Sequence, residues 1–412
     1  MADINMTNPV FNRKFPQQEY WKIRDFYFKL LESKSARKTV WNCLKIQNVI
    51  TDIQNNPDNF WSYWKAFYIP KKDGSQRVVY QPSDILQRFF HIYLILVQTI
   101  DETEEYLIEH KIIDNDFRNL YDSELLVRKC LHDSFLLSHS YNIVGYTSKK
   151  QNSYGFEKGK NISMNATRHK DSQYFLKMDI QAAFPSIKKQ SIFKILYFYE
   201  RKLESLLVIL KTLIYRCSIS DFIQDIEKTK NKNKSYRYTK RMCNGLSEII
   251  TLNNCLITGA SLSPWILNKY LYKFDVNIQK YCQKRNLIYT RYADDLTISS
   301  NCKISRNTHL FIKHMLKNWG MNENTKKTCF QSHKRKNVIT GIVVSYDDKT
   351  KKGSLGIGYK RFNELKKNLY LMKQNKLTEK EEQQTLGMLN FLSSVNIDRY
   401  NYLVEKYELY GF

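Results

Sequence analysis

Two adjacent aspartates inside a β-rich segment constrain this chain more than any other feature. Asp294 and Asp295 lie within the segment 287–299, where apolar and β-branched residues flank them on both sides. This pattern predicts a hairpin with two carboxylates at its tip. A third acid, Asp179, ends the largely apolar run 175–178, which predicts a strand. Adjacent carboxylates repel, and burial of an uncompensated charge is costly, so neighbouring acids often await a cation.

The acidic side chains also indicate which cation they would bind. Mg²⁺ prefers an octahedral shell of oxygens from a few carboxylates, waters and substrate phosphates. Two such ions about 4 Å apart can activate a primer 3′-hydroxyl and stabilise the leaving pyrophosphate. We therefore expect Asp179, Asp294 and Asp295 to hold two Mg²⁺ ions, with Mn²⁺ as the alternative. An acidic pair alone is equally well explained as a solvated turn, but the upstream acid argues against that explanation.

The net charge favours nucleic acid as a partner. Lys and Arg number 66 against 40 Asp and Glu, which gives a formal net charge of +26. Such an excess raises the affinity for a polyanion and speeds the encounter with it. The alternative is a basic protein from a Lys- and Asn-rich proteome, and the size of the excess favours the nucleic-acid explanation.

The cysteines and apolar runs bear on where the chain works. The eight cysteines form no Cys-x-x-Cys pair, which argues against a structural zinc site and a disulfide framework. Residues 1–18 lack the apolar region of a signal peptide. The longest apolar run, 89–97, is too short to span a bilayer. We therefore expect a cytoplasmic protein with no membrane partner.

A series of short motifs follows along the chain. They are a basic hairpin at 69–82, Y-G-F-x-x-G-K-x-I at 154–162, N-A-x-x-H at 165–169, D-I-x-x-x-F-P-S-I at 179–187, Y-A-D-D at 292–295 and V-I-T-G at 338–341. In this order, the motifs resemble those of bacterial retron-type reverse transcriptases. The resemblance covers residues from about 69 to 345, and it implies an RNA-directed DNA polymerase.

The resemblance implies an α+β fold of the right-hand polymerase type, with fingers, palm and thumb. The antiparallel palm sheet would bear the catalytic acids and would be flanked by helices. We expect a helical N-terminal extension at 1–66, fingers with part of the palm at 67–174 and the palm at 175–350. The palm would include a basic insertion at about 222–242, and a small helical thumb would follow at 351–412.

The resemblance also assigns residues to the chemistry. The Ile180 backbone carbonyl would be a further metal ligand, beside the three aspartates. Lys327 lies in a segment similar to the family's N-x-x-K-T element, and it would protonate the leaving pyrophosphate. Because Lys326 is adjacent, the assignment could shift by one residue.

Further residues would bind the incoming deoxynucleoside triphosphate (dNTP). Lys71 and Arg77 would reach its phosphates, or else they are solvated hairpin charges. Phe184 stands where the family places a bulky gate against a ribose 2′-hydroxyl, and the alternative for it is core packing. Thr258 and Gly259 belong to the family's second motif, but Thr258 replaces the Gln that normally lies by the nucleotide. We therefore expect unusual nucleotide selection, fidelity or template dependence.

Two predictions concern RNA binding. Asn165 and His169 would either contact RNA or brace the palm, and the sequence leaves both alternatives open. The basic thumb and the basic insertion would follow the phosphates of an RNA–DNA hybrid or a structured RNA, with a salt-dependent affinity.

These observations leave three hypotheses for function. The first is a retron enzyme that copies a structured non-coding RNA into DNA from dNTPs, in antiphage defence. The second is a non-retron defence enzyme that makes repetitive, template-independent or protein-primed DNA, and Thr258 favours it. The third is a catalytically silent RNA-binding scaffold that controls a toxin, and the intact acids argue against it. A toxin or effector protein and a second copy of the chain are further partners to be tested.

Overall fold

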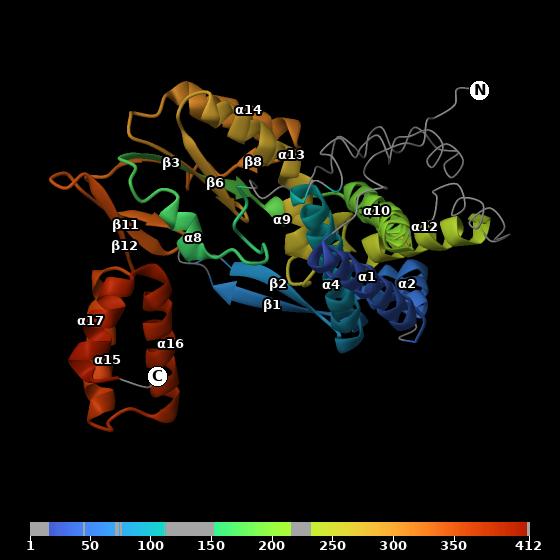
Figure 1. Ribbon diagram of the computed structural model, residues 1–412, viewed down its shortest axis with the longest axis horizontal. Helices are drawn as coiled ribbons and strands as arrows, with labels where there is room; N and C mark the ends of the chain where they lie inside the picture. Colours follow the sequence, from blue (N-terminus) through green and yellow to red (C-terminus); the bar gives the residue numbers. More distant parts are fainter. Residues whose placement is uncertain are drawn as a thin grey trace. The chain divides into compact units, whose positions relative to one another are not determined.

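The computed structural model describes residues 16–43, 46–70, 74, 76–110, 112, 152–215 and 232–409 (Figure 1). The chain divides into two compact units, each built from segments that are distant in sequence. Unit 1 comprises Met1–Lys150 and Phe184–Lys273, and unit 2 comprises Gln151–Ala183 and Phe274–Phe412. The chain therefore enters unit 2, returns to unit 1 and enters unit 2 again.

Unit 1 is mainly helical. Its described helices are α1 (Gln17–Cys43), α2 (Ile46–Asn55), η1 (Pro57–Asn59), α3 (Phe60–Tyr63), α4 (Asp84–Glu109), α10 (Lys189–Tyr215) and α12 (Lys232–Ile249). Helix α1 packs against α4 and α10, and α12 packs against α10 and α2. The apolar run 89–97 lies inside α4, where residues at helical spacing such as Phe89, Tyr93 and Leu96 are fully buried. Among the described residues, no helix combines the length and apolar character needed to cross a membrane.

A buried ionic network joins the helices of unit 1. The Asp101 carboxylate of α4 accepts a contact from Lys269 at 2.9 Å, and Lys202 of α10 pairs with Glu104. Arg37 of α1 pairs with Glu200 of α10. Burial by itself would raise the pKa of Asp101, but Lys269 and Lys202 hold it below its usual value. The cations therefore keep this carboxylate charged inside the core.

Short hairpins complete unit 1. Strands β1 (Trp64–Pro70) and β2 (Gln76–Pro82) are antiparallel, with Pro70 opposite Gln76. This arrangement confirms the hairpin that the sequence predicts at 69–82, although its tip lies largely outside the described residues. Strands β4 (Thr251–Leu252) and β5 (Cys255–Leu256) form a smaller pair.

Unit 2 contains an antiparallel sheet with the order β6-β7-β3-β8, and β9 also pairs with β3. The strands are β3 (Tyr174–Gln181), β6 (Ile288–Tyr292), β7 (Asp295–Ser300), β8 (Asn322–Glu323) and β9 (Cys329–Ser332). Helices α8 (Ile162–Thr167) and α14 (Arg306–Asn318) also belong to unit 2. Helix α13 (Ser263–Gln283) carries the chain from unit 1 into unit 2, and the short α9 (Ala183–Ser186) lies at the preceding crossing. The mixture of helices with an antiparallel sheet agrees with the predicted α+β class.

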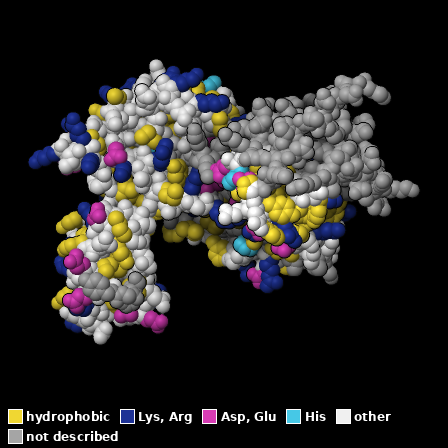
Figure 2. Space-filling model, in the orientation of Figure 1, with side chains coloured by type: hydrophobic (Ala, Val, Ile, Leu, Met, Phe, Trp, Pro, Cys, Tyr) yellow, Lys and Arg dark blue, Asp and Glu magenta, His cyan; other side chains and the backbone are white. Residues whose placement is uncertain are grey.

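A second sheet extends unit 2. It has the order β10-β11-β12, formed by β10 (Asn337–Ile339), β11 (Ile342–Asp347) and β12 (Lys352–Gly356). Figure 2 shows Lys and Arg side chains at the end of the β11–β12 hairpin, whose exposed connection carries Lys349 and Lys351. The segment 351–412, which the sequence predicts to be helical, begins instead with β12 and becomes helical only at Tyr359. The reason is tertiary, since β12 pairs with β11 and Gly353 passes so close to the Lys170 carbonyl oxygen that an added Cβ would lie 1.8 Å from it.

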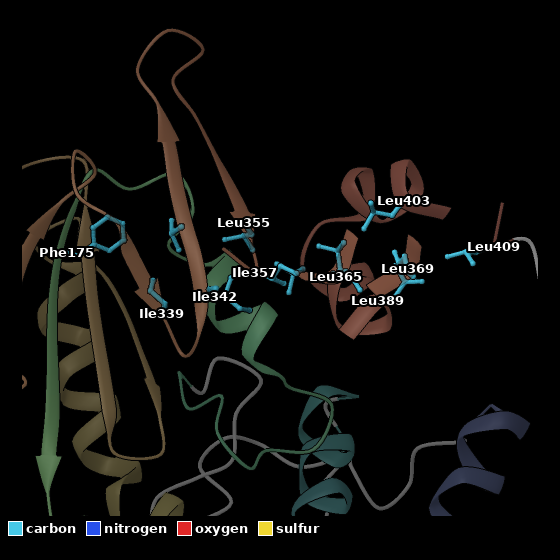
Figure 3. Close-up of a cluster of buried hydrophobic side chains, with 14 residues drawn as sticks. Phe175, Ile339, Ile342, Leu355, Ile357, Leu365, Leu369, Leu389, Leu403 and Leu409 are labelled. Atoms are coloured by element: carbon cyan, nitrogen blue, oxygen red, sulfur yellow. The ribbon is translucent and has the colours of Figure 1, made fainter. Parts of the chain in front are cut away.

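Three helices end the described chain. They are α15 (Tyr359–Lys373), α16 (Glu379–Val395) and α17 (Ile397–Tyr407). Their buried leucines form a cluster with side chains of the second sheet, including Ile342 and Leu355 (Figure 3). Helix α16 starts with a capping box in which Thr378 and Glu381 satisfy each other's backbone N–H groups. The shared cluster attaches the helices firmly to the sheet.

Candidate active site

The two adjacent acids lie at the turn of the β6–β7 hairpin, as the sequence predicts. Tyr292 pairs with Asp295 across the strands, so Ala293 and Asp294 form the turn. Ala293 has a φ of 55°, a left-handed conformation that tight two-residue hairpins require. A non-glycine residue in this conformation is held there by its surroundings. The turn therefore depends on contacts from outside the hairpin.

The third acid comes from the neighbouring strand of the same sheet. Asp179 of β3 pairs in register with Asp295 of β7. The Ile180 N–H donates to the Asp294 carbonyl at 2.9 Å. Asp179 is almost fully buried, whereas Asp295 is exposed. The sheet thus brings together three acids that are far apart in the sequence.

A lysine compensates the charge of the buried acid. The Lys327 Nζ donates to the Asp179 carboxylate at 2.7 Å, and the Asn324 side-chain amide donates to the other oxygen at 3.0 Å. The hydrogen bond to Asp179 is the main cause of a raised pKa for Lys327, and the charges of Asp294 and Asp295 raise it further. The Lys327 ammonium therefore lies in the field of all three carboxylates, and this contact belongs to Lys327 rather than to Lys326.

The carboxylates suit a hard divalent ion, although they are not arranged around one. Carboxylate oxygens are the ligands that Mg²⁺ and Mn²⁺ prefer. Within the residues that the structure describes, no group of three or more His, Cys, Asp or Glu side chains is placed to hold a metal ion. The Asp179 carboxylate contacts Lys327 instead. Metal binding by Asp179, Asp294, Asp295 and the Ile180 carbonyl therefore stays a prediction.

A buried arginine holds the turn from within unit 2. Arg291 is fully buried, and its guanidinium contacts both carboxylate oxygens of Asp275, the shortest contact being 2.6 Å. Its Nη1 also donates to the Ala293 carbonyl at 2.9 Å. The Tyr289 hydroxyl donates to Asp275 at 2.7 Å. Arg291 is a positioning residue that the sequence prediction missed, and its only signal was a charge inside a β-rich run.

A glycine also packs against this turn. The Tyr154 N–H donates to the Arg291 carbonyl at 2.7 Å, and the Arg291 N–H donates to the Asn152 carbonyl at 2.8 Å. These bonds place Gly155 against the turn, where an added Cβ would lie 2.6 Å from the Ala293 nitrogen. The motif at 154–162 thus includes a residue whose lack of a side chain lets two backbones approach.

The two residues predicted to contact RNA or brace the palm are both buried. The His169 ring nitrogens lie 2.7 Å from the Ser299 and Thr290 hydroxyls, on β7 and β6 respectively. Burial lowers the pKa of His169 to about 3, so the ring is neutral. The Asn165 amide donates to the Thr340 hydroxyl at 3.4 Å. The geometry therefore favours the bracing alternative, since neither side chain reaches the surface.

The predicted nucleotide-binding residues that are described belong to unit 1. Lys71 lies outside the described residues, and Arg77 is exposed on β2. The Thr258 hydroxyl donates to the Val78 carbonyl at 3.2 Å. Gly259 has a φ of 112°, and an added Cβ there would lie 1.8 Å from the Tyr80 carbonyl oxygen. The segment containing Thr258 is thus docked along β2.

Phe184 is the remaining residue of this set. It lies on α9 and is half-buried. The Ile187 N–H donates to the Phe184 carbonyl at 3.0 Å and closes a short turn at the end of the motif 179–187. The gate and core-packing alternatives both remain compatible with this exposure.

Comparison with known proteins agrees with the motifs. Residues 136–383 match the sequence model of the family described as "Reverse transcriptase (RNA-dependent DNA polymerase)". The retron Ec86 reverse transcriptase of Escherichia coli is 28% identical over 264 residues, which cover 64% of this chain and 68% of the relative. The retron Ec83 enzyme of the same species is 26% identical over 253 residues, covering 60% and 71%. The retron Ec73 enzyme is 25% identical over 363 residues, covering 83% and 86%.

Solved structures give a weaker likeness. The apo telomerase of Candida tropicalis aligns over 83% of this chain and 57% of its own, with 12% identity and a TM-score of 0.37. A truncated form of it aligns over 74% and 58%, with 15% identity and a TM-score of 0.34.

Proposed function

The chain belongs to the reverse transcriptase (RNA-dependent DNA polymerase) family, and we propose that it copies a structured non-coding RNA into DNA by two-metal-ion catalysis. The family makes it an RNA-directed DNA polymerase, and its relatives include several retron enzymes. The structured template and an antiphage role are parts of the proposal. They are supported by the motifs shared with retron enzymes and by the net charge of +26.

One observation carries the catalytic part of the proposal. Asp179, Asp294 and Asp295 converge at one end of an antiparallel sheet, and a single ammonium lies in the field of all three. A scaffold protein has no need for this convergence. Such a concentration of negative charge requires a compensating cation, which is what a metal-dependent polymerase needs at this position.

The side chains of this site would share the work of nucleotidyl transfer. Asp179, Asp294 and Asp295 would hold divalent ions, which we propose to be Mg²⁺, with Mn²⁺ as the alternative. When bound, such ions activate a primer hydroxyl and stabilise the leaving pyrophosphate. The Lys327 ammonium contacts the Asp179 carboxylate at 2.7 Å, and the three acids stabilise its charged form. It would therefore be able to donate a proton to the pyrophosphate.

A second candidate function rests on Thr258. Its hydroxyl is hydrogen-bonded to the Val78 carbonyl, and the side chain has no amide with which to contact a nucleotide. Weaker selection at this position would suit an enzyme that makes repetitive, template-independent or protein-primed DNA. Phe184, Arg77 and Lys71 stay predictions for dNTP binding under either function.

The test is to sequence the nucleic acids that co-purify with the full chain and with Asp294→Asn/Asp295→Asn. The matched control is Asp347→Asn/Asp348→Asn, an exposed acidic pair at the end of β11. A discrete DNA complementary to one small RNA, present with the wild type and control only, is the expected result. Repetitive or protein-linked DNA with the same dependence would support the second function. Identical RNA and no DNA from all three proteins would leave the toxin-controlling scaffold as the better hypothesis.

The antiphage role needs a separate measurement. Bacteria that express the wild-type chain should give fewer phage plaques than bacteria that express Asp294→Asn/Asp295→Asn. Equal plaque numbers over a panel of phages would contradict the defence role without affecting the polymerase activity.

A further inference from the structure

Helices α2 and α12 of unit 1 pack together (Figure 1). Side chains of both helices line a basic hollow. The hollow has a volume of about 380 Å³. Its lining includes Arg237, Lys240 and Arg241, which lie at helical spacing on α12 and so share one face. These residues belong to the basic insertion that the sequence predicts, but the described part of that insertion is a helix with a defined basic face.

The hollow is a built feature of the packing. An added Cβ at Gly245 would lie 2.4 Å from the Ile50 side chain and 3.2 Å from the Trp41 ring. Both of these apolar side chains are buried and line the hollow. Because residue 245 is a glycine, α2 approaches α12 closely enough to form a floor beneath the basic side chains.

The positive charge of the hollow is not cancelled by the acids of its own helices. Asp52 is the acid of α2, and its carboxylate accepts hydrogen bonds from Asn59 at 2.7 Å and Tyr63 at 2.9 Å. Glu248 is the acid of α12, and it pairs with Lys189 at 2.9 Å. Both acids thus have partners outside the hollow, and the charges of Arg237 and Arg241 can attract an anion.

The opposite wall is neutral and polar. Gln47 and Gln54 of α2 line it at helical spacing, and Asn244 of α12 also lines the hollow. An amide side chain both donates and accepts hydrogen bonds. The RNA 2′-hydroxyl does the same, and it is the group that distinguishes RNA from DNA. A cationic wall facing an amide wall therefore matches a phosphate next to a ribose.

We propose that this hollow binds the sugar–phosphate backbone of RNA. Arg237 and Arg241 contact phosphate oxygens, and Gln47 and Gln54 hydrogen-bond to 2′-hydroxyls. The proposal rests on the proposed function in one respect, namely that the bound strand belongs to the RNA that the enzyme copies. The hollow holds that RNA through unit 1, whereas the acids that carry the chemistry belong to unit 2.

The test compares the full-length wild type with Arg237→Gln/Arg241→Gln. The control is Lys303→Gln/Arg306→Gln, which removes the same charge from exposed positions outside the hollow. Fluorescence anisotropy measures binding of a fluorescein-labelled synthetic RNA hairpin from 50 to 200 mM salt. Loss of two phosphate contacts should lower the slope of log affinity against log salt by about 1.4 to 1.8. Over this range the wild type should then lose roughly tenfold more affinity than Arg237→Gln/Arg241→Gln.

The amide wall gives the proposal its specificity test. Gln47→Leu/Gln54→Leu should weaken binding of the RNA hairpin and leave binding of a DNA hairpin of the same sequence unchanged. Equal losses for RNA and DNA would refute the assignment to RNA and leave a general polyanion site. Equal salt slopes for the wild type, the arginine variant and the control would refute the site altogether.

A second assay separates this proposal from the proposed function. At saturating oligo(dT)–poly(rA), the kcat of extension should be the same in Arg237→Gln/Arg241→Gln as in the wild type, because the hollow contains none of the catalytic carboxylates, whereas the KM for poly(rA) should rise because backbone contacts are lost. If the wild type does not extend this primer, the polymerase mechanism fails while the binding result stands. If the wild type extends it but the salt slopes are equal, the hollow fails and the polymerase stands.

Discussion

Replacement of Gly155 by alanine tests the idea that contacts from outside the hairpin hold the acidic turn. The added Cβ would lie 2.6 Å from the Ala293 nitrogen and 3.1 Å from the Tyr292 carbonyl carbon. Ordinary van der Waals contact begins near 3.4 Å. One of the two backbones must therefore move by roughly 0.8 Å, and a misplacement of about 1 Å can cost on the order of 10²-fold in rate.

The expected result for Gly155→Ala is a kcat about 10²-fold below the wild-type value. Overpacking should also lower the free energy of unfolding by about 1–3 kcal/mol. The assay is steady-state extension of oligo(dT) on poly(rA), with the melting temperature measured in the same buffer. Gly356→Ala is the matched control, because the nearest atom to its new Cβ, in the Arg399 side chain, would lie 3.6 Å away. A folded Gly155→Ala with kcat within about twofold of the wild type would refute the reasoning.

Further predictions concern the lysine, the histidine and the arginine of unit 2. Lys327→Ala should lower kcat by about 10²-fold or more in primer extension, whereas Lys326→Ala should not, and equal effects would contradict the assignment. The pKa of His169 is lowered to about 3. The pKa of this histidine in the unfolded chain is about 6.5. At pH values between these two pKa values, the unfolded chain binds a proton that the folded chain does not. The free energy of unfolding should therefore fall by about 2 kcal/mol from pH 7 to pH 5. In His169→Gln this pH-dependent part of the free energy of unfolding should be absent, which unfolding by denaturant at pH 7 and at pH 5 measures. Arg291→Met leaves Asp275 buried without its cation and should cost about 3–5 kcal/mol in the same measurement, and a loss below about 1 kcal/mol would contradict the bracing role.

Local patterns explain why the acidic hairpin could be predicted. Asp294 and Asp295 sit between β-rich runs, so the turn and its strands are readable within a short window. The partnership with Asp179 was predicted from the chemistry of metal-binding carboxylates and from family motifs, because no local pattern joins the two segments. The register that pairs Asp179 with Asp295 depends on tertiary structure, and no local sequence pattern predicts it.

The bracing contacts could not be predicted for the same reason. Arg291 and Asp275 lie on a strand and a helix whose packing decides that they meet. The motif containing Gly155 was recognised, but the sequence did not show which backbone it approaches. Thr258 was predicted to lie by a nucleotide, and the structure shows its hydroxyl bonded to β2. In each case the partner is distant in sequence.

The position of β3 in its sheet has a consequence for synthesis of the protein on the ribosome. All three strands that pair with β3 come later in the chain, since β7 begins at Asp295, β8 at Asn322 and β9 at Cys329. At a translation rate of about 10 residues per second, β3 waits on the order of ten seconds for its first partner. During that time both edges of an apolar strand are open to pairing with other chains. Nascent chains that stall before residue 295 should therefore aggregate or depend on chaperones.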